Sequence, residues 1–275
     1  MLERLESRQM LAANVSLSAG TLHIVGDNGG NIIAIGFDNH AATIVGVRTN
    51  NGSIQQFPAG NVARVIIDAG NGSDTVIVDE SHASVAFTKP TVINAGGGND
   101  QITAASEADT ITGGDGNDTI AGGGGMDFLD GGAGSDRVTG GAAHDVILGQ
   151  GGNDTIDGAG GNDLLFGGPS GDLIIGGTGD DTLFGGRGGD VLRGGDGADY
   201  IFGQQDADSM DGGVGNDFLY GNAGVDTLSG GVGSDVIYTG GDVGDQVAGG
   251  STDDLLVRAE FVRISRLARR LAVLT

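Results

Sequence analysis

Residues 113–121 read Gly113-Gly114-Asp115-Gly116-Asn117-Asp118-Thr119-Ile120-Ala121, and units of this pattern follow one another along more than half of the chain. The aspartate in the sixth place recurs sixteen times at a spacing of nine, from Asp100 to Asp235. One inserted residue near Tyr238 shifts the frame, after which Asp245 and Asp254 bring the series to eighteen units. A period of nine suits neither a helix nor a hairpin, and it indicates a stack of short repeated units.

Each unit has the form G-G-x-G-N/D-D-x-U-x, where U is an aliphatic residue two places after the aspartate in all eighteen units. The glycines permit the left-handed backbone of a tight turn. The last three residues read as a short strand whose aliphatic side chain points into a core while its neighbours point outward. We therefore expect a six-residue turn and a three-residue strand in each unit. Stacking would align the aspartates and loop carbonyls, which are the hard oxygen ligands that calcium prefers.

The composition narrows the class of protein. The 275 residues include 58 Gly, 3 Pro and no Cys or Trp, which excludes collagen-like and disulfide-stapled proteins. The formal net charge is −24, and residues 100–257 hold 28 acidic against 3 basic residues. This charge argues against nucleic acid and anionic membranes as partners and favours divalent cations. No apolar run approaches the length of a membrane span, so we expect no transmembrane segment.

The repeated unit resembles the haemolysin-type calcium-binding repeat, the RTX nonapeptide, over residues 96–257. The resemblance implies an all-β fold, a right-handed parallel β-roll in which successive units alternate between two sheets and 18 residues make one coil. Eighteen units would give nine coils, a roll about 43 Å long. It also implies calcium ions held between turns by loop carbonyls and by motif aspartates 18 residues apart, such as Asp118 with Asp136. The implied metal ligands are Asp100, Asp118, Asp127, Asp136, Asp145, Asp154, Asp163, Asp172, Asp181, Asp190, Asp199, Asp217, Asp226, Asp235 and Asp245.

Some units depart from the pattern. The unit ending at Asp109 has no glycine before it, and the unit ending at Asp208 keeps one. The units ending at Asp145 and Asp254 lose the third glycine, and we expect ions in all four units to be weaker or absent. The alternative interpretation of the whole array is a glycine-rich solenoid in which the aspartates only form turns.

The two ends suggest a division into four parts. Residues 1–13 resemble the LExLExRxLLA element near the N-terminus of many planctomycete surface and exported proteins, although they also read as an amphipathic helix. Residues 14–95 contain alternating stretches and a match between 67–76 and 93–102 at a spacing of 26, which predict a β-rich cap with longer coils. An independent β-sandwich is the alternative for this part. Residues 96–257 form the predicted calcium-binding roll.

The last part, residues 258–275, has apolar residues at helical spacing with arginines between them. We expect a short basic amphipathic helix here, a C-terminal cap that docks on the acidic roll. The apolar positions are Phe261, Ile264, Leu267, Leu271 and Leu274.

The aromatic residues of the array all belong to alternate units and hence to one of the two sheets. An exposed apolar face of this size marks a covered surface or an interaction surface. Either the C-terminal helix covers it, or a protein, a glycan or a second copy of the chain docks there. The aromatic residues are Phe128, Phe166, Phe184, Tyr200, Phe202, Phe218, Tyr220 and Tyr238.

No catalytic constellation is visible. The four histidines, His23, His40, His82 and His144, are scattered, and no H-E-x-x-H motif is present. His144 reads as a solvated loop residue. We expect a non-enzymatic, calcium-binding structural or adhesion protein at the cell surface or outside the cell, whose array folds on binding Ca²⁺. The alternative is a carbohydrate-binding or enzyme-accessory module that uses the aromatic sheet.

Overall fold

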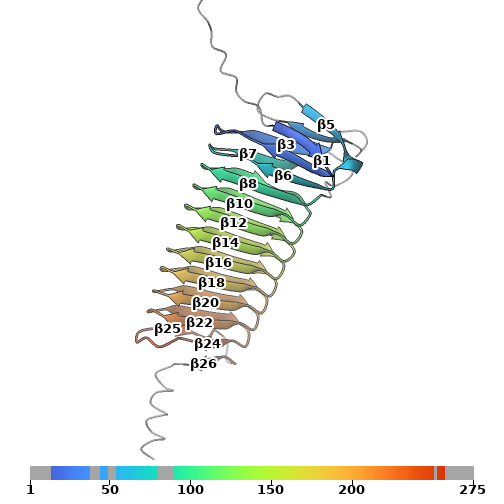
Figure 1. Ribbon diagram of the computed structural model, residues 1–275. Helices are drawn as coiled ribbons and strands as arrows, with labels where there is room; N and C mark the ends of the chain where they lie inside the picture. The colour runs from blue at the N-terminus through green and yellow to red at the C-terminus, as the bar shows by residue number, and fades with distance from the viewer. Residues whose placement is uncertain (1–13, 38–43, 49–53, 80–88, 251–252, 258–275) are drawn as a thin grey trace, which may run out of the picture.

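The chain folds into a β-solenoid made of two facing sheets. The computed structural model describes residues 14–37, 44–48, 54–79, 89–250 and 253–257. Within them it contains two 13-stranded sheets and one turn of 3₁₀ helix, Ala59–Asn61. Figure 1 shows the coils stacked into a long, narrow rod. The all-β parallel solenoid, with about nine turns, is the fold that the sequence predicts.

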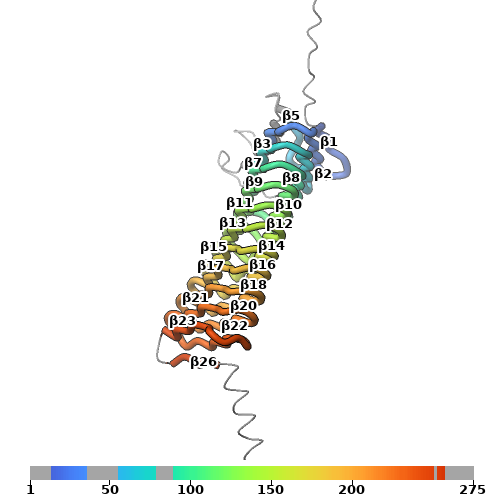
Figure 2. Tube along the Cα trace, turned by 90° about the vertical axis from the view of Figure 1, so that its left-hand side faces the viewer, coloured from blue at the N-terminus to red at the C-terminus, as the bar shows by residue number. Residues whose placement is uncertain are grey.

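From β5 (Ile54–Pro58) onward, the strands alternate between the two sheets along the chain. Sheet A contains, in spatial order, β1 (Asn14–Ser18), β2 (Thr21–Val25), β6 (Arg64–Asp68), β8 (Thr91–Gly97), β10 (Thr110–Asp115), β12 (Phe128–Ala133), β14 (Val146–Gly151), β16 (Leu164–Pro169), β18 (Thr182–Arg187), β20 (Tyr200–Gln205), β22 (Phe218–Ala223), β24 (Val236–Tyr238) and β26 (Leu255–Val257). Sheet B contains β25 (Gln246–Ala248), β23 (Thr227–Val232), β21 (Ser209–Val214), β19 (Val191–Asp196), β17 (Leu173–Thr178), β15 (Thr155–Gly160), β13 (Arg137–Ala142), β11 (Thr119–Gly124), β9 (Gln101–Thr103), β7 (Thr75–Asp79), β3 (Ile32–Phe37), β4 (Ile44–Arg48) and β5 (Ile54–Pro58). Figure 2 shows strands such as β10, β12 and β14 on one side of the rod and β11, β13 and β15 on the other.

The register confirms the predicted coil of 18 residues. Parallel neighbours pair Ile111 with Leu129 and Ile120 with Val138. The inserted residue near Tyr238 lengthens the next coil to 19, since Thr227 pairs with Gln246. The longer N-terminal coil is also confirmed, because Ile67 pairs with Ile93, 26 residues later.

The prediction of three-residue strands is wrong. In the regular array, strands such as β11 have six residues, the last three of one unit and the first three of the next. The paired glycines extend the ladder, because Gly123 pairs with Gly141 and Gly124 with Ala142 in the following coil. The turn is therefore confined to three residues, which end at the motif aspartate.

The core is one ladder of aliphatic side chains between the sheets. From Ile102 to Ile237 every side chain at the U position is at most 2% exposed. Burial of each contributes roughly 1.5–3 kcal/mol relative to exposure. Within the described residues the last position of the ladder is less covered, since Leu256 in the last strand is 46% exposed.

The N-terminal strands belong to the same two sheets as the array. Strand β2 pairs in parallel with β6, and β3 with β7. Strand β1 is antiparallel to β2, and β4 and β5 form antiparallel pairs beyond β3. The N-terminal element at residues 1–13 and the predicted C-terminal helix at 258–275 lie outside the described residues. In the part of the chain that the structure describes, no helix is long and apolar enough to cross a bilayer.

Candidate metal-binding rows at the edges of the roll

The motif aspartates form two rows, one along each edge of the roll. Turns from sheet A to sheet B carry Asp74, Asp100, Asp118, Asp136, Asp154, Asp172, Asp190, Asp208, Asp226 and Asp245. Turns back to sheet A carry Asp109, Asp127, Asp145, Asp163, Asp181, Asp199, Asp217, Asp235 and Asp254. Those from Asp74 to Asp235 are at most 3% exposed, whereas Asp245 is half-buried.

Asp118 illustrates how the coils hold each motif aspartate. Its main-chain N–H donates to Oδ1 of Asp136 at 2.8 Å, and its carbonyl accepts from the N–H of Arg137 at 2.8 Å. Its own Oδ1 accepts the N–H of Asp100 at 2.8 Å. Three of its four hydrogen-bonding groups are thus paired with neighbouring coils, and only Oδ2 remains.

That remaining oxygen is buried without a hydrogen-bond partner in fifteen motif aspartates and in Asp74, which holds the same place in the longer coil before the array. A buried carboxylate oxygen that neither water nor a donor satisfies is costly, and a native fold normally supplies a partner. The sixteen are Asp74, Asp100, Asp118, Asp127, Asp136, Asp145, Asp154, Asp163, Asp172, Asp181, Asp190, Asp199, Asp208, Asp217, Asp226 and Asp235. Asp109 differs, since its Oδ2 accepts a long hydrogen bond of 3.4 Å from the N–H of Ala105.

A second oxygen lies beside this one in every regular turn. A Cβ built on the first glycine of a unit, such as Gly149, would lie 3.0 Å or less from both Oδ2 of Asp154 and the carbonyl oxygen of Gly167 in the next coil. The same pair of oxygens recurs at all fourteen first glycines from Gly113 to Gly230. The repeated glycine therefore leaves space where a carboxylate oxygen and a carbonyl oxygen converge. Alanine holds this position in the first coils, at Ala69, Ala95 and Ala104.

The electrostatics of the rows favour a bound cation. Burial raises the pKa of Asp127, Asp172, Asp181 and Asp208 to about 7, although each carboxylate accepts a main-chain hydrogen bond that lowers it. Neighbouring carboxylates in the row raise the pKa of these groups further. In the described ranges, no basic side chain forms an ion pair with these carboxylates. Among the described residues, no basic side chain therefore offsets the charge of these four carboxylates.

This donor set fits calcium. The convergent atoms are carboxylate and carbonyl oxygens, the ligands that Ca²⁺ takes in variable number. Within the described residues no three His, Cys, Asp or Glu side chains come together, so side chains alone do not form a metal cluster. A cation in a turn would need main-chain carbonyls as well as the aspartate Oδ2. The structure places the predicted ligands in two rows. Within the regular part of each row, successive aspartates are 18 residues apart in the sequence and lie on adjacent coils, as do Asp118 and Asp136.

Two parallel sheets joined by Gly-Asp turns, with oxygen atoms converging at each edge, define a nonapeptide β-roll of the metal-binding kind. In agreement, the family model of the RTX calcium-binding nonapeptide repeat matches overlapping segments that together span residues 94–245, more than half of the chain. The chain belongs to this family of calcium-binding repeat proteins. No curated protein matches the chain.

The structure also contains a second hydrogen-bond ladder, which sequence reasoning missed. In several units, the side chain in the fifth place accepts the N–H of the residue 18 positions later. Asn99 accepts from Asn117 at 2.9 Å, and Asn117 accepts from Ser135 at 2.8 Å. His144, exposed as expected, accepts the N–H of Asn162 through Nδ1 at 2.5 Å. Recurrent Asn and Ser in this place are the signal that could have revealed the ladder.

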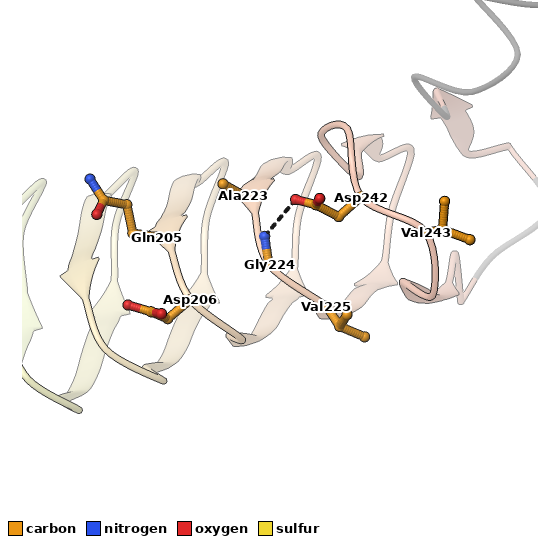
Figure 3. A pocket seen from close by; sticks show the side chains of 7 residues that line it. All are labelled: Gln205, Asp206, Ala223, Gly224, Val225, Asp242 and Val243. Atoms are coloured by element: carbon orange, nitrogen blue, oxygen red, sulfur yellow. Dashed lines mark hydrogen bonds between the residues drawn. The ribbon is translucent and has the colours of Figure 1, made fainter.

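Irregular units keep the row intact. Asp208 is buried with an unpartnered Oδ2 although its unit has lost two glycines, because Gln204 and Asp206 adopt positive φ angles of 84° and 72°. Figure 3 shows a pocket at this end of the edge, where Asp242 accepts the N–H of Gly224 at 2.8 Å. Asp206 and Asp242 stand where other units have glycine, and they add exposed carboxylates on separate coils.

Proposed function

We propose that this chain is a calcium-dependent structural or adhesion protein, located outside the cell or on its surface, whose array folds as it binds Ca²⁺. The observation that carries the proposal is the pair of rows of buried, unpartnered Oδ2 atoms. Calcium in the turns would neutralise these carboxylates and supply the missing partner. The residues that would hold it are the motif aspartates named above, together with loop carbonyls such as that of Gly167.

The same chemistry makes folding depend on the metal. Residues 100–257 carry a net charge of −25, with 28 acidic and 3 basic residues, on a glycine-rich chain that loses much entropy on ordering. Without cations, repulsion between carboxylates along each edge opposes stacking. Weak sites of the extracellular kind would stay empty at cytosolic calcium levels and fill outside the cell. The chain would then remain unfolded until export.

Stacking of the aromatic side chains disfavours the carbohydrate-binding alternative. Phe184 lies between Phe166 and Phe202, with ring centroids 5.0 and 4.9 Å away and interplanar angles of 7° and 9°. Sugars stack on the faces of aromatic rings, whereas these faces are already taken by neighbouring rings. The stacked rings of Phe166, Phe184 and Phe202 present their edges to the outside instead, and ring edges suit apolar contact better than sugar stacking. We assign no catalytic role to the roll.

Adjacent aspartates provide a matched test of the metal sites. We expect Asp181→Asn to raise the calcium midpoint of folding about three- to tenfold and to lower the number of bound ions, since one lost ligand costs on the order of 1 kcal/mol. The asparagine retains an Oδ1 for the N–H of Asp163, which now donates at 2.8 Å, but replaces Oδ2 with a non-ligating amide. Isothermal titration calorimetry gives both quantities.

The control is Asp180→Asn, which removes the same charge one residue away. Asp180 is exposed, and its Oδ1 accepts the N–H of Ala198 at 2.8 Å, a bond that asparagine can keep. We expect its midpoint to stay within about twofold of the parent, as for an exposed charge. Equal shifts for the two variants would mean that general repulsion, not ligation by Oδ2, sets calcium affinity.

A further inference from the structure

Sheet A presents an uncharged apolar face over its last seven strands, β14 to β26. We call this the aromatic face. It consists of two lines of outward side chains, which are Val146, Leu164, Thr182, Tyr200, Phe218, Val236 and Leu255 in one and Leu148, Phe166, Phe184, Phe202, Tyr220, Tyr238 and Val257 in the other. None of these fourteen side chains is charged, although the chain has a net charge of −24.

The aromatic face has a defined beginning. In its second line, the four positions before Leu148, on β6 to β12, are polar: Asp68, Asn94, Thr112 and Asp130. The first line is mixed over the same strands, because Ile66, Val92 and Phe128 alternate there with polar His23 and Thr110. Both lines together are therefore free of charged side chains and predominantly apolar from β14 to β26, the last strand of the sheet.

The side chains of this face remain partly in contact with water within the described structure. Tyr200 is 53% and Leu255 56% exposed, and the other rings are half-buried by one another. Ring contacts run along the face to its end, with Phe218 and Tyr238 centroids 5.3 Å apart. A contiguous apolar face on a soluble rod is normally covered by another part of the chain or by a partner.

The chain itself supplies a segment of the right position, length and charge. Strand β26 ends at Val257, at the end of the aromatic face, and eighteen more residues follow it. As the helix that their apolar spacing predicts, they would be about 27 Å long, and seven strands span about 29 Å. The segment has 5 basic residues and 1 acidic residue, opposite in sign to the roll. Docking of a second copy of the chain would instead bring together two molecules that each have a net charge of −24 and therefore repel each other.

We propose that residues 258–275 fold back along the aromatic face, with Phe261, Ile264, Leu267, Leu271 and Leu274 against the rings. The arginines between them then extend towards the acidic edges of the roll. The border at Leu148 marks how far the segment reaches, which explains why the apolar line stops there. This inference is separate from the calcium sites, because it concerns the outer surface of sheet A.

Tyrosine fluorescence tests the proposal in the full chain. The protein has no Trp and 3 Tyr, and all three, Tyr200, Tyr220 and Tyr238, lie on the aromatic face. In saturating calcium, we expect acrylamide to quench the tyrosine fluorescence of the parent weakly and that of Leu271→Asp at least about twice as strongly. A charge at residue 271 would be costly to bury in an apolar contact, so the segment would leave the aromatic face and expose the tyrosines. The matched control Ser265→Asp adds the same charge outside the apolar spacing and is expected to quench like the parent.

Far-UV circular dichroism and sedimentation velocity accompany the quenching. Unchanged dichroism shows that the calcium-loaded roll persists in each variant, so a failure of calcium-dependent folding is recognised separately. A monomeric parent whose tyrosines are shielded until Leu271→Asp exposes them supports the proposal. Two results overturn it: equal, strong quenching in parent and variants, which leaves the face bare, or concentration-dependent dimers that protect the tyrosines in Leu271→Asp as well.

Discussion

Gly149→Ala is expected to raise the calcium concentration at the midpoint of folding about tenfold, which corresponds to roughly 1.4 kcal/mol. The added methyl group would occupy the space between Oδ2 of Asp154 and the carbonyl of Gly167. These are the two oxygens that converge in the turn, so the substitution separates them and removes the space for a cation. Calcium titration followed by circular dichroism gives the midpoint.

Gly151→Ala is the control in the same unit and the same strand, β14. A Cβ there would meet only the carbonyl oxygen of Gly132, at 4.0 Å, and Ala133 already holds this place in the preceding coil. Neither Gly149 nor Gly151 has a positive φ, so the effects of alanine on the unfolded chain cancel in the comparison. We expect the control midpoint to stay within about twofold. Equal midpoints for the two variants would mean that the convergent oxygens of Asp154 and Gly167 do not bind the cation.

Acid is expected to substitute in part for calcium. The pKa of buried motif aspartates such as Asp136 and Asp199 is raised to about 6, and that of Asp181 to about 7, from 3.8, chiefly by burial. Between about pH 4 and pH 7, the metal-free folded state therefore binds more protons than the unfolded state. Its stability is lowest above about pH 7, rises as the pH falls through the folded pKa values, and gains nothing more below about pH 4.

Circular dichroism of the chelated chain from pH 8 to pH 5 measures this effect. We expect a coil spectrum at pH 8 and recovery of at least about half of the calcium-bound β signal at pH 5. Added NaCl at pH 8 is the control, because it screens exposed charges without protonating buried ones. A chelated chain that stays coil-like down to pH 5, or that salt folds equally well, would contradict the assignment of buried carboxylates as the obstacle to folding.

Much of the fold could be predicted from the spacing of Asp and aliphatic residues. The nine-residue period with one aliphatic residue per unit predicts a stack of short units, and the resemblance to the RTX nonapeptide implies two sheets with 18-residue coils. The pairing of Ile111 with Leu129 confirms this coil length. The six-residue strands could not be predicted, because glycine has low strand propensity and pairs here only through the stacked coil. The pairing of Gly123 with Gly141 is a property of the assembled roll.

The candidate site was predictable in its residues but not in its geometry. The aspartate series identifies the rows, yet the oxygen beside Asp154 Oδ2 belongs to Gly167, in the next coil. The loss of glycines before Asp208 predicts a weaker ion there, and this stays a prediction. The turn itself is kept, because Gln204 and Asp206 adopt the left-handed backbone. Non-glycine residues accept such angles when neighbouring coils impose them, which local sequence does not reveal.

The most direct test of the account is a calcium titration of the chelator-stripped full chain, followed by far-UV circular dichroism, with magnesium as the control. We expect a cooperative change from coil to β structure at pH 7.5 with calcium and none at the same concentration of magnesium. Magnesium ions give up their bound waters reluctantly and require a stricter coordination geometry than calcium ions. A chain that is fully β-structured at that pH without metal would contradict the account, and the aspartate rows would then be a metal-independent element of the solenoid.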